Sequence, residues 1–137
     1  MTEFITYLNF DGNCREAMEF YKGCFGADLY LLPFSEAPGD LPGSKEAKDR
    51  VMHATLSKGS SAILMASDTM PGTPFQPGNN FSVMIRCESL QEIEGLFAAL
   101  GEKGKVTMAL QETFWAARFG TLTDRFGISW IIQLETS

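Results

Sequence analysis

Residues 4–24 read FITYLNFDGNCREAMEFYKGC, and this stretch contains two periodicities in succession. Apolar and polar side chains first alternate, as in a strand with one covered face. We expect every second side chain to face a helix, and this set is Phe4, Thr6, Leu8 and Phe10. Beyond Asn13 the apolar spacing becomes i, i+3, i+4 and i+7, which is typical of an amphipathic helix. Its apolar positions are Ala17, Phe20, Tyr21 and Cys24. Asn13 and Glu16 predict a capping box at the helix start, and Gly26 predicts its end.

The same pattern returns in residues 81–101, FSVMIRCESLQEIEGLFAALG. Ser89 and Glu92 repeat the capping pair, and Ser89 follows Asn13 by 76 residues. Gly101 predicts the helix end. The strand positions expected to face the helix are Phe81, Val83, Ile85 and Cys87. The helix positions are Ile93, Leu96, Phe97 and Leu100. The chain therefore contains an internal duplication of a strand followed by a helix.

A β-hairpin is predicted after each helix. Residues 51–56 and 61–67 flank the turn Lys58-Gly59, and residues 119–123 and 128–134 flank a turn at Phe126-Gly127. Each half then has a βαβββ pattern. The sequence predicts one α+β domain, residues 1–137, with module one at about 1–68, a linker at about 69–80 and module two at about 81–137. The extra residues of the first half, 32–49, are rich in Pro, Gly and acid and predict a mobile loop.

Composition and charge exclude several classes of protein. The net charge of −6 argues against binding to nucleic acid or to anionic lipid surfaces. No apolar run approaches the roughly 20 residues of a membrane helix. No basic, apolar leader opens the sequence, so we expect a cytoplasmic protein.

Three cysteines are present, and none forms a CxxC pair. This pattern disfavours a disulfide framework or a structural zinc site. We expect small buried apolar residues. The alternative for Cys14 is a reactive thiol, because this residue is predicted in the first turn of a helix, where a thiolate is favoured.

Four segments together resemble the PhnB-like branch of the vicinal oxygen chelate superfamily. They are YLNFDGNCREAMEFY (7–21), VMHATL (51–56), LMASD (64–68) and TFWAARFGTLTDRFGISW (113–130). The superfamily includes glyoxalase I, extradiol dioxygenases and bleomycin-resistance proteins. The resemblance implies curved mixed sheets from two modules that form an open barrel around a cavity, often in a homodimer.

Superfamily members that use a metal place its ligands at one point on the first and last strand of each module. Carried over to this sequence, these points fall near Ile5, Ile63, Ser82 and Ile131. Neither these residues nor their neighbours one step away are His, Asp, Glu or Cys, the side chains that a divalent metal needs. We therefore predict no metal and no cofactor. Relatives of this branch have also carried a demethylubiquinone methyltransferase label. The sequence lacks a Gly-rich turn between strand and helix for a nucleoside cofactor, so it gives that activity no support.

The alternation of the strands predicts which side chains line the cavity. The predicted lining comprises Tyr7, Asn9, His53, Thr55, Ile63, Met65, Met84, Arg86, Ile131 and Gln133. Trp115 and Phe119 join it because the repeat matches Thr121 with His53. Alternation places Trp130 on the opposite, helix-facing side of its strand, so it is predicted to lie in the core. Ligand binding is assigned to Tyr7, Asn9, His53, Met65, Met84, Arg86, Trp115, Phe119 and Gln133.

Each of these residues also has a purely structural interpretation. His53 is either a hydrogen-bonded structural residue, a ligand contact or a catalytic base. The methionines can fill gaps in packing, and Arg86 can form a salt bridge at a strand end. Three functions follow: a metal-independent protein that binds a small molecule, an enzyme that uses His53 as acid or base, or a protein that acts through its dimer surface.

Overall fold

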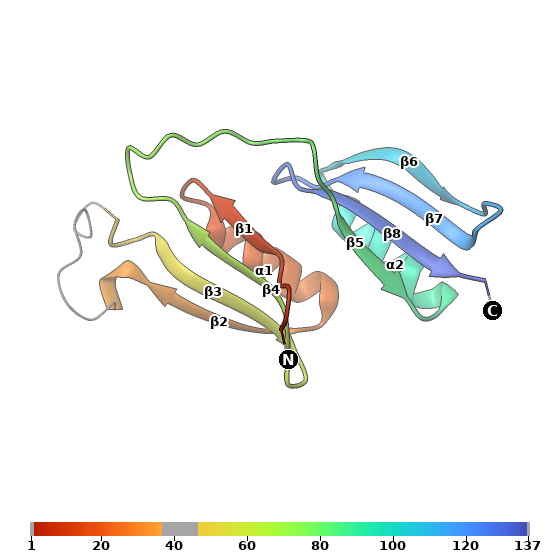
Figure 1. The fold of residues 1–137 in the computed structure, drawn as a ribbon, viewed down its shortest axis with the longest axis horizontal. Helices are drawn as coiled ribbons and strands as arrows, with labels where there is room; N and C mark the ends of the chain where they lie inside the picture. The colour runs from red at the N-terminus through yellow and green to blue at the C-terminus, as the bar shows by residue number, and fades with distance from the viewer. Residues whose placement is uncertain (1, 37–46, 137) are drawn as a thin grey trace. The chain divides into compact units, whose positions relative to one another are not determined.

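The computed structural model describes residues 2–36 and 47–136 of the chain. The chain separates into two compact units, Met1–Gln76 and Pro77–Ser137, here called module one and module two. Each module contains a four-stranded sheet and one α-helix (Figure 1). The predicted α+β class with two βαβββ modules is therefore confirmed.

Both modules use the same order of elements. Module one consists of β1 (Tyr7–Phe10), α1 (Cys14–Phe25), β2 (Asp28–Pro33), a 3₁₀ turn (Phe34–Glu36), β3 (Val51–Lys58) and β4 (Ser61–Asp68). Module two consists of β5 (Val83–Cys87), α2 (Leu90–Gly101), β6 (Lys105–Gln111), β7 (Ala116–Thr123) and β8 (Ser129–Glu135).

The two sheets have equivalent topologies. The strand order is β1-β4-β3-β2 in module one and β5-β8-β7-β6 in module two. The first and last strands of each module pair in parallel, and the remaining pairs are antiparallel. Both predicted hairpins are present, and their turns contain Gly59 (φ 63°) and Gly127 (φ 89°), which adopt a backbone conformation that favours glycine.

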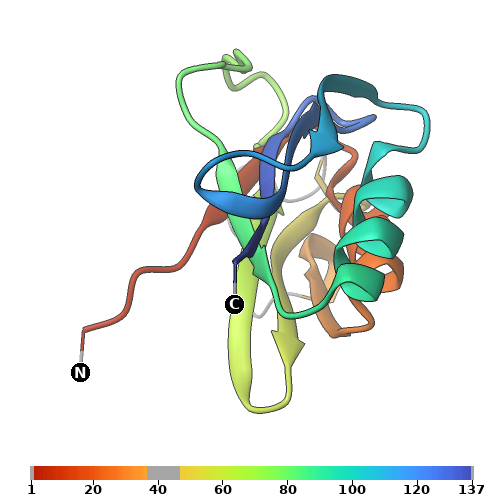
Figure 2. The ribbon, with the colours of Figure 1, turned by 90° about the vertical axis from the view of Figure 1, so that its right-hand side faces the viewer.

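Each helix covers one face of its own sheet, and the core of each module lies between them. In Figure 2 each helix lies on one side of the strands of its module. The buried strand residues of module one include Leu8, Phe10, Ala54, Leu56, Leu64 and Ala66. Those of module two include Cys87, Leu122, Trp130 and Ile132. Because strand side chains alternate, the residues between them lie on the face that the helix leaves uncovered, which we call the open face of each module.

The buried stripe of α1 differs from the prediction. Cys14, Ala17, Met18 and Tyr21 are buried, whereas Phe20 and Cys24 are only partly buried. The spacing is still i, i+3, i+4 and i+7, but the stripe begins one turn earlier. The sequence could not distinguish the predicted stripe from the observed one, because both sets of positions hold apolar side chains.

The predicted strands extend too far towards their N-termini. Phe4 and Thr6 precede β1 and are exposed, and Phe81 precedes β5 and is also exposed. β1 pairs with β4 only from Tyr7 onward, and β5 pairs with β8 only from Val83 onward. The prediction that these three side chains face a helix is wrong, because their alternation continues beyond the paired part of each sheet.

The predicted capping box of α1 is also wrong. Asn13 makes no side-chain hydrogen bond to the helix start. The carboxylate of Asp68, at the end of β4, instead accepts hydrogen bonds from the backbone N–H groups of Gly12 (2.8 Å) and Cys14 (3.0 Å). A side chain distant in sequence thus replaces the local cap.

The second capping box forms in a modified version. Ser89 Oγ accepts from the backbone N–H of Glu92 at 3.1 Å, as predicted. The Glu92 carboxylate accepts from the backbone N–H of Glu88, one residue before the N-cap, at 2.6 Å. The predicted helix ends agree with the structure: Gly26 is left-handed (φ 61°), and α2 ends at Gly101.

The described ends of the predicted loop 32–49 contain hydrogen-bonded structure. Leu32 and Pro33 belong to β2, and the 3₁₀ turn follows directly. Backbone hydrogen bonds join Phe34 N–H to Arg50 C=O (3.0 Å) and Ser35 N–H to Lys48 C=O (3.2 Å). The predicted loop is therefore wrong at its N-terminal end, because β2 and the 3₁₀ turn extend into it, whereas residues 47–49 at its other end form a turn. Its central part, 37–46, lies outside the described residues.

Across residues 2–36 and 47–136, no helix has the length and apolar character needed to cross a membrane.

Candidate functional site

The open face of module one is built from two rows of side chains that cross the sheet. The pairing register places Tyr7, Met65, Thr55 and Tyr30 in one row. In the adjacent row Asn9 pairs with Ser67 and Leu32 pairs with His53. The pairing of Ala54 with Ala66, continued by one residue, places His53 beside Ser67. Ile63, an exposed residue of β4, shares this face by alternation. The structure thus brings Tyr7, Asn9, His53 and Met65 of the predicted site together on one surface.

His53 is hydrogen-bonded at both ring nitrogens. Its Nε2 lies 3.0 Å from Thr55 Oγ1, and its Nδ1 lies 3.4 Å from the hydroxyl oxygen of Tyr7. The rings of Tyr7 and His53 are 6.0 Å apart between centroids and tilted by 36°. His53 is half-buried, whereas Tyr7 is exposed. The imidazole therefore connects an exposed phenol to an aliphatic hydroxyl on the same face.

The open face of module two has an equivalent pair of rows with different chemistry. One row contains Met84, Ile131, Thr121 and Met108, and the other contains Arg86, Gln133, Phe119 and Gln111. Met84, Arg86, Phe119 and Gln133 of the predicted site therefore share one surface. Arg86 donates to Glu135 at 3.2 Å in an exposed ion pair, the structural alternative foreseen for this residue.

These registers correct one detail of the predicted repeat. Row by row, Thr121 of module two occupies the place of Thr55 in module one, and Phe119 occupies the place of His53. The match of Thr121 with His53 is therefore wrong by two residues. Strand side chains alternate with a period of two, so this shift leaves Phe119 on the same face.

The tryptophans lie in opposite environments. Trp130 is 2% exposed and donates from Nε1 to the Asp124 carboxylate at 2.8 Å, so the predicted core position is confirmed. Trp115 is 46% exposed and meets the ring of Phe119 edge to face, with centroids 5.2 Å apart. Phe114 is 96% exposed and meets Trp115 in the same way at 4.7 Å. We call Phe114, Trp115 and Phe119 the aromatic cluster.

The positions carried over from metal-binding relatives hold no typical ligand side chain. Ile63 and Ile131 lie in β4 and β8, and Ile5 and Ser82 precede β1 and β5. In the parts of the chain that the structure describes, no group of three or more His, Cys, Asp or Glu residues is arranged to hold a metal ion.

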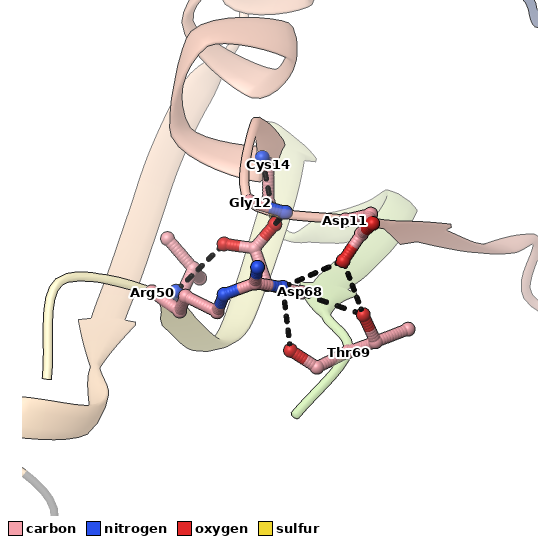
Figure 3. Close-up of polar contacts among 7 residues, drawn as sticks. Asp11, Gly12, Cys14, Arg50, Asp68 and Thr69 are labelled. Carbon is pink, nitrogen blue, oxygen red and sulfur yellow. Dashed lines mark hydrogen bonds and ion pairs between the residues drawn. The ribbon is translucent and has the colours of Figure 1, made fainter. Parts of the chain in front are cut away.

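Sequence reasoning missed the polar cluster at the end of β4, drawn in Figure 3. The buried Asp68 carboxylate accepts a third backbone hydrogen bond from Val51 N–H at 2.9 Å, in addition to those from Gly12 and Cys14. It thereby ties β4 to β3 and to the start of α1. The only sequence signal was the Asp that ends the apolar segment LMASD, where a charge contrasts with the preceding strand residues.

Arg50 lies near the Asp68 carboxylate and belongs to the same polar cluster (Figure 3). Its guanidinium pairs with Asp11 at 2.9 Å and donates to the backbone C=O of Thr69 at 3.0 Å. The hydrogen bond from Arg50, with one from the Thr69 hydroxyl, holds the pKa of the Asp11 carboxyl below its usual value. Arg50, Asp11 and Thr69 thus bind one another, and Asp68 binds backbone groups, which makes this a structural corner of module one.

Cys14 lies in the first turn of α1 but is fully buried. Burial raises the pKa of its thiol to about 12, and the neighbouring Asp68 carboxylate adds to this effect. The reactive-thiol alternative is therefore wrong, because loss of solvation outweighs the helix N-terminus. Burial likewise raises the pKa of Cys87 to about 11.

We accordingly expect Cys14 to resist thiol reagents in the folded protein near pH 8, since the thiol is protonated and inaccessible. Labelling with Ellman's reagent or iodoacetamide, followed by peptide mass spectrometry, should modify the partly exposed Cys24 first. All three cysteines should react in guanidinium chloride. Labelling of Cys14 in the native state at the rate of a free thiol would contradict this expectation.

Comparison with known proteins identifies relatives along almost the whole chain. The model of a family described as 3-demethylubiquinone-9 3-methyltransferase matches residues 2–133. Protein YjdN of Escherichia coli (strain K12) is 36% identical over 138 residues, which cover 93% of this chain and 92% of that protein.

Solved structures show the same fold. Protein PA1353 from Pseudomonas aeruginosa is 43% identical with a TM-score of 0.89, and 100% of each chain is covered. A putative 3-demethylubiquinone-9 3-methyltransferase, PhnB protein, from Bacillus cereus is 27% identical with a TM-score of 0.77 and covers 97% of this chain and 99% of its own. A glyoxylase/bleomycin resistance protein/dioxygenase domain from Frankia sp. EAN1pec reaches a TM-score of 0.68 at 13% identity, over 99% and 98% of the two chains, which is a likeness of fold.

Proposed function

We propose that this chain, which belongs to the protein family described as 3-demethylubiquinone-9 3-methyltransferase and to the PhnB-like branch of the vicinal oxygen chelate superfamily, binds a small molecule without a metal ion. The ligand class that its open faces suit is a planar or amphipathic compound. The single cavity predicted from the sequence remains a prediction, and the proposal rests on the open face of each module taken separately.

The aromatic cluster is the observation that carries this proposal. Large aromatic side chains usually bury most of their surface, yet Phe114 and Trp115 remain exposed and contact each other edge to face. Met84 and Ile131 extend the apolar surface across the same sheet, while Gln133, beside Phe119, offers an amide. A surface of this kind, apolar with a few polar groups, is typical of sites for small ligands.

We expect Trp115→Ala to weaken binding of a planar ligand by about 1–3 kcal/mol, the usual contribution of a stacking contact. A thermal-shift screen of planar compounds would supply the ligand, and isothermal titration would measure the loss. In Trp115→Phe, where Trp130 is the remaining tryptophan, ligand-induced quenching should largely disappear.

Val106→Ala is the matched control for this experiment. Val106 is 49% exposed, close to the value for Trp115, but it pairs with the buried Leu122 on the helix side of the sheet. It should bind the ligand as the wild type does. Equal losses of affinity in the two variants, or quenching that arises from Trp130, would count against a site at the aromatic cluster.

Metal independence is the second part of the proposal. Aliphatic and hydroxyl side chains at the four carried-over positions offer a divalent ion poor ligands compared with His or carboxylates. We expect protein purified without chelators to contain far less than one equivalent of zinc, nickel, iron or manganese per chain. Elemental analysis that finds about one tightly bound ion per chain would refute this part.

The methyltransferase in the family description is a name for the family, and we do not propose that activity for this chain. Nucleoside cofactors commonly bind at a Gly-rich turn between a strand and a helix of a doubly wound sheet. The corresponding turns here are Asp11-Gly12-Asn13 and Glu88-Ser89, and only the first contains a glycine. Each sheet is instead half of a duplicated βαβββ fold.

An enzyme that uses His53 as acid or base is the second candidate. The observation in its favour is the contact of His53 with the exposed hydroxyl of Tyr7 on the open face. Turnover of a bound compound that is lost in His53→Ala would support this alternative, whereas saturable binding without turnover supports the first proposal. A cytoplasmic homodimer remains our prediction for the assembly and location of the protein.

A further inference from the structure

We propose that Tyr7, His53 and Thr55 form a hydrogen-bond relay that makes the Tyr7 hydroxyl an acceptor for a hydroxyl group on an uncharged ligand. This inference rests on the proposed function, because it names the polar chemistry of a ligand bound on the open face of module one. It depends on the described contacts of these three side chains and on the charges around them.

The relay has a preferred direction. A neutral imidazole donates from one nitrogen and accepts at the other. A phenol is a stronger donor than an aliphatic hydroxyl, so Tyr7 donates to Nδ1 and the Nε2–H group donates to Thr55 Oγ1, 3.0 Å away. His53 then has its proton on Nε2. The Tyr7 hydroxyl has used its only hydrogen, so it can offer a ligand only its lone pairs.

The surroundings favour a ligand without charge. Neither row of the open face that contains Tyr7 or His53 includes Asp, Glu, Lys or Arg. At one end of the sheet Arg50 and Asp11 pair with each other, and at the other end Asp28 lies opposite Ser57. A charged group held over these rows would lose water without gaining a counter-ion, which is costly.

The chain suits a direct test because His53 is its single histidine. In protein labelled with ¹⁵N-histidine, long-range ¹H–¹⁵N spectra report one imidazole and distinguish its two tautomers. We expect the Nε2–H tautomer in the wild type and a mixture in Thr55→Val, which removes the acceptor at Nε2. A dominant Nδ1–H tautomer in the wild type would overturn the proposed direction of the relay.

Three probes with one benzene ring test the ligand chemistry: phenol, anisole and benzoate. Phenol can donate a hydrogen bond, anisole cannot, and benzoate is charged. We expect phenol to shift the His53 signals saturably and to bind roughly threefold to tenfold more tightly than anisole, as one neutral hydrogen bond allows. Benzoate should bind more weakly than phenol. Equal affinities for phenol and anisole, or tighter binding of benzoate, would overturn the proposal.

Tyr7→Phe should abolish the difference between phenol and anisole. Tyr30→Phe is the matched control, because Tyr30 lies in the same row but its hydroxyl is not one of the two that contact His53. It should preserve the difference, and an equal loss in both variants would contradict the relay. If phenol quenches Trp115 but leaves His53 unchanged, the relay fails as a ligand site while the proposed function stands. If phenol shifts neither signal, the relay proposal also fails, and the compound screen with Trp115→Ala decides the proposed function.

Discussion

Trp130→Ala is expected to lower the free energy of unfolding by about 3–5 kcal/mol, the usual cost of truncating a buried aromatic side chain. The indole is 2% exposed and packs on the helix side of β8. Its removal leaves a large cavity and takes away the Nε1–H donor that Asp124 accepts at 2.8 Å. Urea or guanidinium unfolding, followed by circular dichroism, measures the change.

Trp115→Ala is the internal comparison for this experiment. It removes the same side chain from an exposed position, so we expect its stability to stay within about 1 kcal/mol of the wild type. Trp130→Phe separates packing from the hydrogen bond to Asp124, because it keeps a buried aromatic ring without the N–H group. If Trp115→Ala destabilised the protein as much as Trp130→Ala, the assignment of core and open face would be wrong.

Asp68→Asn is expected to lower the free energy of unfolding by about 3 kcal/mol. Asp68 accepts backbone hydrogen bonds from Gly12, Cys14 and Val51. Asparagine keeps the volume but replaces one acceptor oxygen with a donor NH₂ group. At least one buried N–H then faces another donor, and the bonds that remain lose their charged partner; each of these effects costs roughly 1–3 kcal/mol. Chemical unfolding measures the change.

Asp11→Asn is the control for charge in the same corner. Asp11 is exposed and pairs with Arg50, so its replacement removes an exposed ion pair and leaves the three backbone donors of the Asp68 site unchanged. We expect a much smaller effect than for Asp68→Asn. Amide hydrogen exchange should also be faster at Cys14 and Val51 in Asp68→Asn alone. Equal stability of the two variants would show that Asp68 does not anchor α1.

Features that depend on neighbouring residues could be predicted from the sequence. The apolar spacing after Asn13 and Ser89 identified both helices, and the glycines at 59 and 127 identified both hairpin turns. Strand alternation also separated Trp130 from Phe119, because side chains with a period of two can occupy only two faces. The duplication of these local patterns was enough to predict the α+β fold with two βαβββ modules.

Pairing between distant segments decided what the sequence could not. The alternation at Phe4 and Phe81 continues beyond the last partner residue of each sheet, so no local pattern marks where the strands begin. The start of α1 is held by a carboxylate 54 residues away from Cys14, which overrides the local capping signal. The contact of His53 with Tyr7 joins residues 46 apart across the sheet. The tertiary structure determined these features because a hydrogen bond needs two groups within about 3 Å, a condition that strand register sets and sequence spacing does not.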